Sequence, residues 1–123
     1  MENRIEEFTL GGKNFIYFDL SEFKENSEYR EFAEVAKKRI AKYAKCSLFT
    51  IANIRDIKFD TETKKIVAEW MEYNKPYVKC GVVIGFDGIK RMVVNAVFKM
   101  VGRKNMVFFH SREQAVEWLL KQE

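Results

Sequence analysis

Residues 77–109, YVKCGVVIGFDGIKRMVVNAVFKMVGRKNMVFF, decide the fold of this chain. Residues 77–84 are apolar enough to be buried on both faces, which is typical of an interior strand of a parallel sheet. Gly85-Phe-Asp-Gly88 forms a tight turn, and Gly102 ends a helix predicted over residues 89–101. Residues 106–109 form the next strand. Two strands joined by a helix run parallel with a right-handed crossover, so the stretch predicts one complete β-α-β unit.

The predicted elements on either side of this unit extend the same alternation. Residues 5–8 and 15–19 are expected to form a hairpin around Gly11 and Gly12. Next comes a helix that is capped by Ser27 and apolar on one face as far as Ala44, followed by a strand over 47–51. The order is completed by a helix capped by Asp60 or Thr61 and a final helix that begins after Ser111. This order predicts an α/β fold: a mostly parallel four- to five-stranded sheet with an N-terminal hairpin and four helices.

The whole-chain composition limits the classes of protein. A length of 123 residues, 33% charged and 47% apolar, fits one folded domain over residues 1–123. No apolar run is long enough to span a membrane, and MENRIEEF lacks a signal-peptide core, so a cytoplasmic location is expected. Cys46 and Cys80 lie too far apart for a CxxC metal site, and a single histidine adds no ligand cluster. No metal or cofactor is therefore expected.

The positive charge of the chain lies in its second half. The net charge is +4, and residues 63–123 carry 11 Lys and Arg against 6 Asp and Glu. Five of these cations gather on or just after the central helix: Lys90, Arg91, Lys99, Arg103 and Lys104. Such a cluster is able to meet an anionic surface, but an ordinary solvated face is the preferred interpretation. Nucleic acid is disfavoured as a partner because the chain has no RNP-type aromatic motif and no zinc-finger spacing.

Several motifs of the chain resemble those of the SpoIIAA-like family, a bacterial branch of the STAS fold named for sulfate transporters and anti-sigma-factor antagonists. The matching stretches are Asn74-Lys-Pro-Tyr-Val-Lys79, Gly85-x-x-Gly88-Ile-Lys-Arg91, Asn95-Ala96 and Gly102-Arg-Lys104. The resemblance covers nearly the whole chain and implies a sheet wound by β-α units, shared more distantly with the CRAL-TRIO lipid carriers. The branch has no established activity, so the resemblance implies an architecture rather than a role.

The chain departs from the family at the phosphorylation motif. Anti-sigma-factor antagonists carry Asp-Ser-Ser-Gly before their second helix and are phosphorylated on the first serine, whereas the matching positions here are Asp60-Thr61-Glu62-Thr63. Thr61 is the candidate phospho-acceptor. A phosphate there would lie at a helix N-terminus, which is favourable, but it would be repelled by Asp60 and Glu62. A helix-capping role for this segment is the preferred interpretation.

Polar residues follow the strands at the carboxyl edge of the predicted sheet, where ligands of such sheets gather. These rim residues are Asp19, Ser21, Asn53, Asp56, Asp87 and His110. A hydrolase would pair His110 with Ser21 or Ser111, but no G-x-S-x-G elbow is present and Ser111 is expected to cap a helix. The glycines of the central unit are spaced GxxxGxxG rather than G-x-G-x-x-G, so no nucleotide cofactor is indicated. A non-catalytic role is therefore expected.

The central helix is apolar on more than one side. One stripe, expected to cover the sheet, consists of Ile89, Met92, Val93, Ala96, Val97 and Met100. A second stripe and its surroundings form the predicted ligand or partner patch: Phe86, Lys90, Arg91, Val94, Phe98 and Val101. A helix that is apolar nearly all round is buried twice, once by its own sheet and once by something else. The alternative is that both stripes form one wide internal face.

These observations predict a binding or regulatory module, with two alternatives. The first binds a small apolar or lipid-like ligand near the central helix, and the second is a protein-interaction module that forms a homodimer or meets a regulatory partner. Peripheral membrane contact is also open. A pocket lined by Phe86, Val94 and Phe98 would favour the ligand, whereas a flat exposed apolar patch would favour a protein partner. Trp70 and Trp118 are expected to be largely buried.

Overall fold

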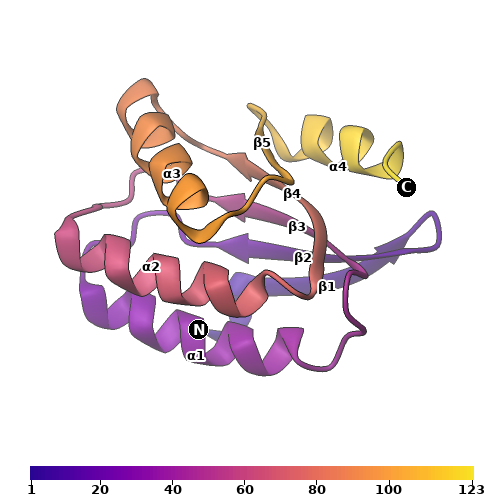
Figure 1. The fold of residues 1–123 in the computed structure, drawn as a ribbon, viewed down its shortest axis with the longest axis horizontal. Coiled ribbons are helices and arrows are strands. Elements are labelled where there is room, and N and C mark those ends of the chain that lie inside the picture. The colour runs from indigo at the N-terminus through magenta and orange to yellow at the C-terminus, as the bar shows by residue number, and fades with distance from the viewer.

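The computed structural model describes residues 1–123 and contains a five-stranded sheet with helices on both faces (Figure 1). The strands lie in the order β1-β2-β3-β4-β5; β1 is antiparallel to β2, and all other pairs are parallel. After a 3₁₀ turn at Glu2–Arg4, the elements are β1 (Ile5–Leu10), β2 (Lys13–Asp19), α1 (Asn26–Ile40), β3 (Leu48–Asn53), α2 (Thr61–Asn74), β4 (Val78–Ile84), α3 (Gly88–Val101), β5 (Met106–Phe108) and α4 (Arg112–Leu120). The predicted α/β architecture is confirmed.

The central unit forms as its sequence predicts. β4 lies between β3 and β5, and six of its seven residues are buried. Gly85 follows it with a φ of 77°, and a Cβ there would lie 2.3 Å from Asn53 Oδ1, so only glycine fits this turn. Gly102 closes α3 with a φ of 73°. The predicted boundaries of this helix are correct to one residue.

The helices form two unequal layers. α1, α2 and α3 cover one face of the sheet, while α4 lies alone on the other (Figure 1). The larger core lies under the three helices and includes Trp70, whose ring meets Phe18 edge-on at 5.0 Å and Phe32 at 5.6 Å. The smaller core lies under α4, where Ala115 and Leu119 are fully buried.

Trp118 is only half-buried, so the prediction that both tryptophans are largely buried holds for Trp70 alone. The Trp118 ring packs beside Phe109 at 5.8 Å between ring centres. α4 is nine residues long and has no neighbouring helix on its face of the sheet. A large side chain on its flank therefore keeps an edge in water.

The first helix begins earlier and ends earlier than predicted. Its N-cap is Glu25 rather than Ser27, because the Glu28 carboxylate accepts the backbone N–H groups of Glu25 and Lys24, both at 2.9 Å. The helix ends at Ile40 instead of continuing to Ala44. In α2, Asp60 is the N-cap as predicted. None of the helices combines the length and apolarity needed to cross a membrane.

Candidate ligand cavity beneath helix α3

A cavity of about 50 Å³ lies inside the larger core, between the sheet and helices α2 and α3. Fifteen of its eighteen lining residues are hydrophobic. The sheet, α2 and α3 each contribute walls, among them Ala52 and Val83, Val67 and Trp70, and Val94 and Phe98. A space of this size is large enough for water-sized molecules but much smaller than a pocket that encloses a drug-sized ligand.

Helix α3 forms the outer wall of this cavity, and its buried side combines Val97 of the stripe predicted to cover the sheet with Val94 and Phe98 of the second stripe. Val94, Val97 and Phe98 are the buried residues of the helix, with 2–3% of each exposed. Ile89, Met92 and Met100, expected to cover the sheet, are 77%, 75% and 66% exposed. The two stripes are similarly apolar, so periodicity alone did not say which of them faces inward.

The other members of the predicted patch lie outside the cavity, at the two ends of α3. Phe86 is half-buried and meets Phe108 edge-on at 5.2 Å. The Arg91 guanidinium lies over Phe108 at 5.0 Å and over Phe86 at 5.6 Å, within the range of a cation–π contact. Lys90 pairs with Asp87 at 3.1 Å. Val101 is half-buried at the C-terminal end of the helix. The cavity therefore takes only Val94 and Phe98 from the predicted set.

Arg103 is the charged residue that lines the cavity, and it is only 7% exposed. Its Nη1 donates to the Met71 carbonyl at 3.3 Å, its Nε donates to Asn105 Oδ1 at 3.3 Å, and its Nη2 lies 2.9 Å from the Met106 sulfur. No carboxylate pairs with it. Burial lowers the pKa of this guanidinium to about 10, because water no longer solvates its charge.

The burial of Arg103 corrects the interpretation of the basic cluster as one exposed group. Sequence reasoning placed Arg103 with Lys104 on a surface, yet Lys104 is exposed while Arg103 is inside. The left-handed Gly102 turns the chain back toward α2, and the Arg103 backbone N–H then bonds the Phe98 carbonyl at 2.8 Å. A glycine cap followed by Arg-Lys was the available signal, but it does not say which of the two cations points inward.

The floor of the cavity beside Arg103 is a row of residues across three strands. Thr50, Gly81 and Met106 are register partners on β3, β4 and β5. A Cβ on Gly81 would lie 2.6 Å from Thr50 Oγ1 and 2.7 Å from the Met106 sulfur, so these two side chains already fill the space over the glycine. Thr50 is 5% exposed and its hydroxyl has no hydrogen-bond partner in the protein.

Asn74 is the third polar residue that lines the cavity, and its side-chain amide forms its hydrogen bonds within its own helix. With its amide oxygen turned toward the indole, it accepts a hydrogen bond from Trp70 Nε1 and donates one to the Trp70 carbonyl, both at 3.3 Å. Tyr29 likewise donates its hydroxyl to the Lys58 carbonyl at 2.8 Å. The polar groups with spare hydrogen-bonding capacity in the cavity are therefore Arg103 and Thr50.

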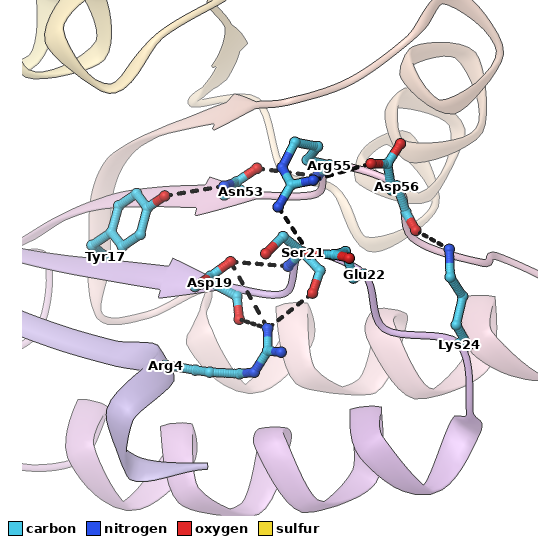
Figure 2. Close-up of polar contacts among 9 residues, drawn as sticks. All are labelled: Arg4, Tyr17, Asp19, Ser21, Glu22, Lys24, Asn53, Arg55 and Asp56. Atoms are coloured by element: carbon cyan, nitrogen blue, oxygen red, sulfur yellow. Dashed lines mark hydrogen bonds and ion pairs between the residues drawn. The ribbon is translucent and has the colours of Figure 1, made fainter.

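The predicted rim residues of β2 and β3 do come together at the carboxyl edge of the sheet (Figure 2). Arg4 Nη1 donates to the carbonyl oxygens of Ser21 at 2.9 Å and Asp19 at 3.2 Å, and Asp19 Oδ1 accepts the Ser21 N–H at 3.0 Å. Asn53 donates to the Tyr17 hydroxyl at 3.2 Å. The polar groups here hold the strand ends together.

A second part of the same rim is built around Arg55. Its guanidinium pairs with Glu22 at 3.0 Å and with Asp56 at 3.1 Å (Figure 2). Glu22 and Asp56 both have positive φ values, 64° and 56°. Both carboxylates are exposed and paired with Arg55. We therefore interpret this cluster as a structural link between loops rather than as a reactive group.

The remaining rim residues stand apart from these two groups. His110 is exposed, and its ring lies 5.3 Å from that of Phe86. It has no hydrogen bond to Ser21 or Ser111, and the Ser111 hydroxyl accepts the Gln114 N–H at 3.1 Å, as a helix cap does. Asp87 caps α3 as predicted, with Oδ1 accepting the Lys90 N–H at 2.8 Å. The structure does not assemble the Ser-His-Asp arrangement that a hydrolase would need.

The segment that replaces the phosphorylation motif is a helix cap. Asp60 accepts the Thr63 N–H at 2.9 Å, which lowers the pKa of the Asp60 carboxyl below its ordinary value. Thr63 is 1% exposed and its hydroxyl donates to Asn26 Oδ1 at 2.7 Å, linking α2 to α1. Thr61 is exposed in the first turn of α2. No group of His, Cys, Asp or Glu side chains is arranged to hold a metal ion.

The overall fold is similar to that of solved structures. An uncharacterized DUF3478-family protein with a SpoIIAA-like fold from Shewanella loihica superimposes with a TM-score of 0.72 at 11% identity, covering 94% of this chain and 91% of that one. The chain has a SpoIIAA-like STAS fold. An anti-sigma-factor antagonist (STAS) domain protein from Planctomyces limnophilus matches with a TM-score of 0.57 at 9% identity, covering 94% and 97%. No family model and no curated protein matches the sequence. At these identities the STAS likeness establishes the fold alone.

Proposed function

We propose that this STAS domain is a non-catalytic binding module that holds a small apolar or lipid-like molecule beneath α3. The observation that carries the proposal is the apolar cavity walled by Val94 and Phe98 inside the larger core. Native cores contain few voids, and a dry apolar space readily takes up an apolar molecule. Fully paired rim carboxylates favour binding over catalysis.

A ligand larger than the present cavity would enter by outward movement of α3. This helix buries three residues, whereas α1 buries five and α2 buries six. A helix with a smaller buried face loses less apolar contact when it shifts. α3 is therefore the wall of the cavity that yields at the lowest free-energy cost.

The test uses 1-octanol as an uncharged apolar probe. Native mass spectrometry of the freshly purified protein first reports any retained small molecule, and calorimetric titration then measures octanol binding. Ala52→Leu fills the cavity from the sheet and is expected to reduce octanol affinity at least tenfold, while Ala41→Leu makes the same change at an exposed site and leaves the affinity unchanged. Equal affinities in the wild type and both variants, or no octanol binding at all, would refute the proposal.

A second function is favoured by the outer face of the same helix. Ile89, Met92 and Met100 leave three large apolar side chains in water along one side of α3, and exposed patches of this kind mark interaction sites. A second copy of the chain is the proposed partner, with the exposed Lys99 and Lys104 meeting acidic residues early in α1. One of the similar structures is described as an anti-sigma-factor antagonist domain, which is in line with a regulatory role.

Self-association is tested by light scattering after size-exclusion chromatography. Met92→Glu is expected to keep the fold and to convert a concentration-dependent dimer into a monomer, because a carboxylate is costly to bury in an apolar contact. Glu117→Gln, an exposed change on α4, is the control and leaves the mass unchanged. A wild-type protein that is monomeric at every concentration would exclude the homodimer.

A further inference from the structure

Arg103 is a buried charge without an anionic partner. A guanidinium has five N–H donors, and Arg103 uses three of them, one each on Nε, Nη1 and Nη2. One of these three bonds goes to a thioether sulfur, which is a weak acceptor. Two N–H groups, one on each terminal nitrogen, remain for a ligand. An isolated charge is costly to bury, so a bound anion would relieve a real free-energy penalty.

The cavity wall beside this guanidinium carries a second polar group. The Thr50 and Met106 side chains both lie over Gly81, and the Met106 sulfur is also in contact with Arg103 Nη2, so the Thr50 hydroxyl and the guanidinium line neighbouring parts of the cavity. The Thr50 hydroxyl, unused by the protein, is able to donate to an acceptor in the cavity. A head group in the cavity would have both a cation and a hydroxyl among its lining groups.

The remainder of the cavity is suited to a hydrocarbon chain. Arg103, Asn74 and Val78 lie at the amino end of the parallel strands, while Leu20 and Ile54 line the cavity at the carboxyl end. The walls between these ends are apolar. The cavity therefore has one polar end and one apolar end, separated along the strand direction.

We propose that the ligand of this cavity is an amphipathic monocarboxylic acid of the fatty-acid type, with its carboxylate on Arg103 and Thr50 and its chain along the apolar walls. The inference rests on the function proposed above and names the ligand class. One buried cation balances one negative charge, whereas a phosphate would bring nearly two into an apolar space. The two parallel N–H groups of a guanidinium also match the two oxygens of a carboxylate.

The first experiment compares two probes of equal chain length on the wild-type protein at pH 7.5. Octanoate is expected to bind at least tenfold more tightly than 1-octanol, because a hydrogen-bonded charge pair replaces an unpaired buried cation. Within the series butanoate, hexanoate and octanoate, affinity is expected to rise about fourfold for each methylene that enters the cavity. Isothermal titration calorimetry measures both effects.

The second experiment removes the cation. Arg103→Met keeps the length of the side chain and is expected to preserve the fold, since replacing a buried charge by an apolar group is often neutral or stabilising. The variant should bind octanol as the wild type does and lose the preference for octanoate. Lys104→Met, the matched control, removes an adjacent exposed charge and should keep the preference. Thr50→Val is expected to weaken octanoate binding about fivefold with little effect on octanol.

The outcomes separate the two proposals. Equal binding of octanol and octanoate by the wild type would overturn the carboxylate site and leave the apolar-ligand function standing. Binding of neither probe would refute both. An Arg103→Met protein that keeps the octanoate preference would show that the charge is not the determinant. If that variant does not fold, the wild-type comparison of the two probes and the Thr50→Val titration still decide the question.

Discussion

The Lys75 ammonium donates a hydrogen bond to the Val101 carbonyl oxygen at 3.1 Å, and thereby joins the C-terminal ends of α2 and α3. The bond lies at the C-terminal end of α3, next to Gly102, which reverses the chain and precedes the buried Arg103. It is exposed, so its contribution to global stability is small, about 0.5 kcal/mol. Its position suggests that it restrains α3 locally.

Lys75→Met is therefore expected to speed hydrogen exchange of the backbone amides of α3 severalfold while leaving α1 unchanged. The physical reason is that α3 buries few residues and loses one of its ties to α2. Lys64→Met, an exposed change on α2 away from α3, serves as the control. Equal exchange rates in α3 for both variants and the wild type would show that Lys75 does not restrain the helix.

Phe98 is expected to be essential for the fold. It is 3% exposed and contributes to both the core and the cavity wall, so Phe98→Asp should lower the free energy of unfolding by more than the roughly 3–5 kcal/mol of a simple truncation. Met100→Asp places the same carboxylate on the outer face of α3, where 66% of the side chain is exposed, and should change stability by less than about 1 kcal/mol. Urea denaturation measures both. The sequence analysis placed Phe98 in a patch for a ligand or partner, and its burial shows that it belongs to the core of the domain.

Gly81 is expected to tolerate no side chain. A Cβ would lie 2.6 Å from Thr50 Oγ1, and threonine is held by its branched side chain, so Gly81→Ala should destabilise the protein by about 1–3 kcal/mol. The flexible Met106 side chain, 2.7 Å away, could move aside more easily. Gly88→Ala is the matched control because nothing lies within 4 Å of its Cβ position, at the start of α3. Thermal unfolding midpoints that shift equally would contradict the steric argument.

The pair formed by Glu6 and Arg112 is expected to give a pH-dependent contribution to stability. Arg112 donates to both carboxylate oxygens, at 2.8 Å and 3.1 Å, and these hydrogen bonds lower the pKa of Glu6 from its ordinary value of 4.5. A lowered folded-state pKa means that the stabilisation is complete above about pH 4.5 and disappears as the pH falls through the folded-state pKa.

Glu6→Gln should accordingly be less stable than the wild type at pH 7, and the difference should shrink below pH 4.5. The pair is half-exposed, so solvent screening keeps the difference small. Glu113→Gln, an exposed change in the first turn of α4, is the control for the general loss of a carboxylate. A Glu6→Gln difference that stays constant from pH 7 to pH 3 would exclude a contribution from this pair.

The local order of the chain could be predicted because each signal acts over a few residues. Gly11 and Gly12 adopt the positive φ values that the hairpin turn requires, and Gly102 adopts the left-handed conformation that ends α3. Asp60, Asp87 and Ser111 accept the backbone N–H groups that helix N-termini leave unpaired. The apolar run of β4 indicated an interior parallel strand for the same reason, since polar alternation would be needed on a face open to water.

The cavity and its charge were decided by the tertiary structure. α3 carries similar apolar stripes on opposite sides, and only its packing against α2 and the sheet determines that Val94 and Phe98 face inward and Met92 outward. Arg103 and Lys104 are adjacent cations, and only the direction of the chain after Gly102 buries the first and exposes the second. Thr50, Gly81 and Met106 are remote in sequence and become neighbours through strand register. Burial and register depend on contacts between distant segments, which the periodicity of one segment does not contain.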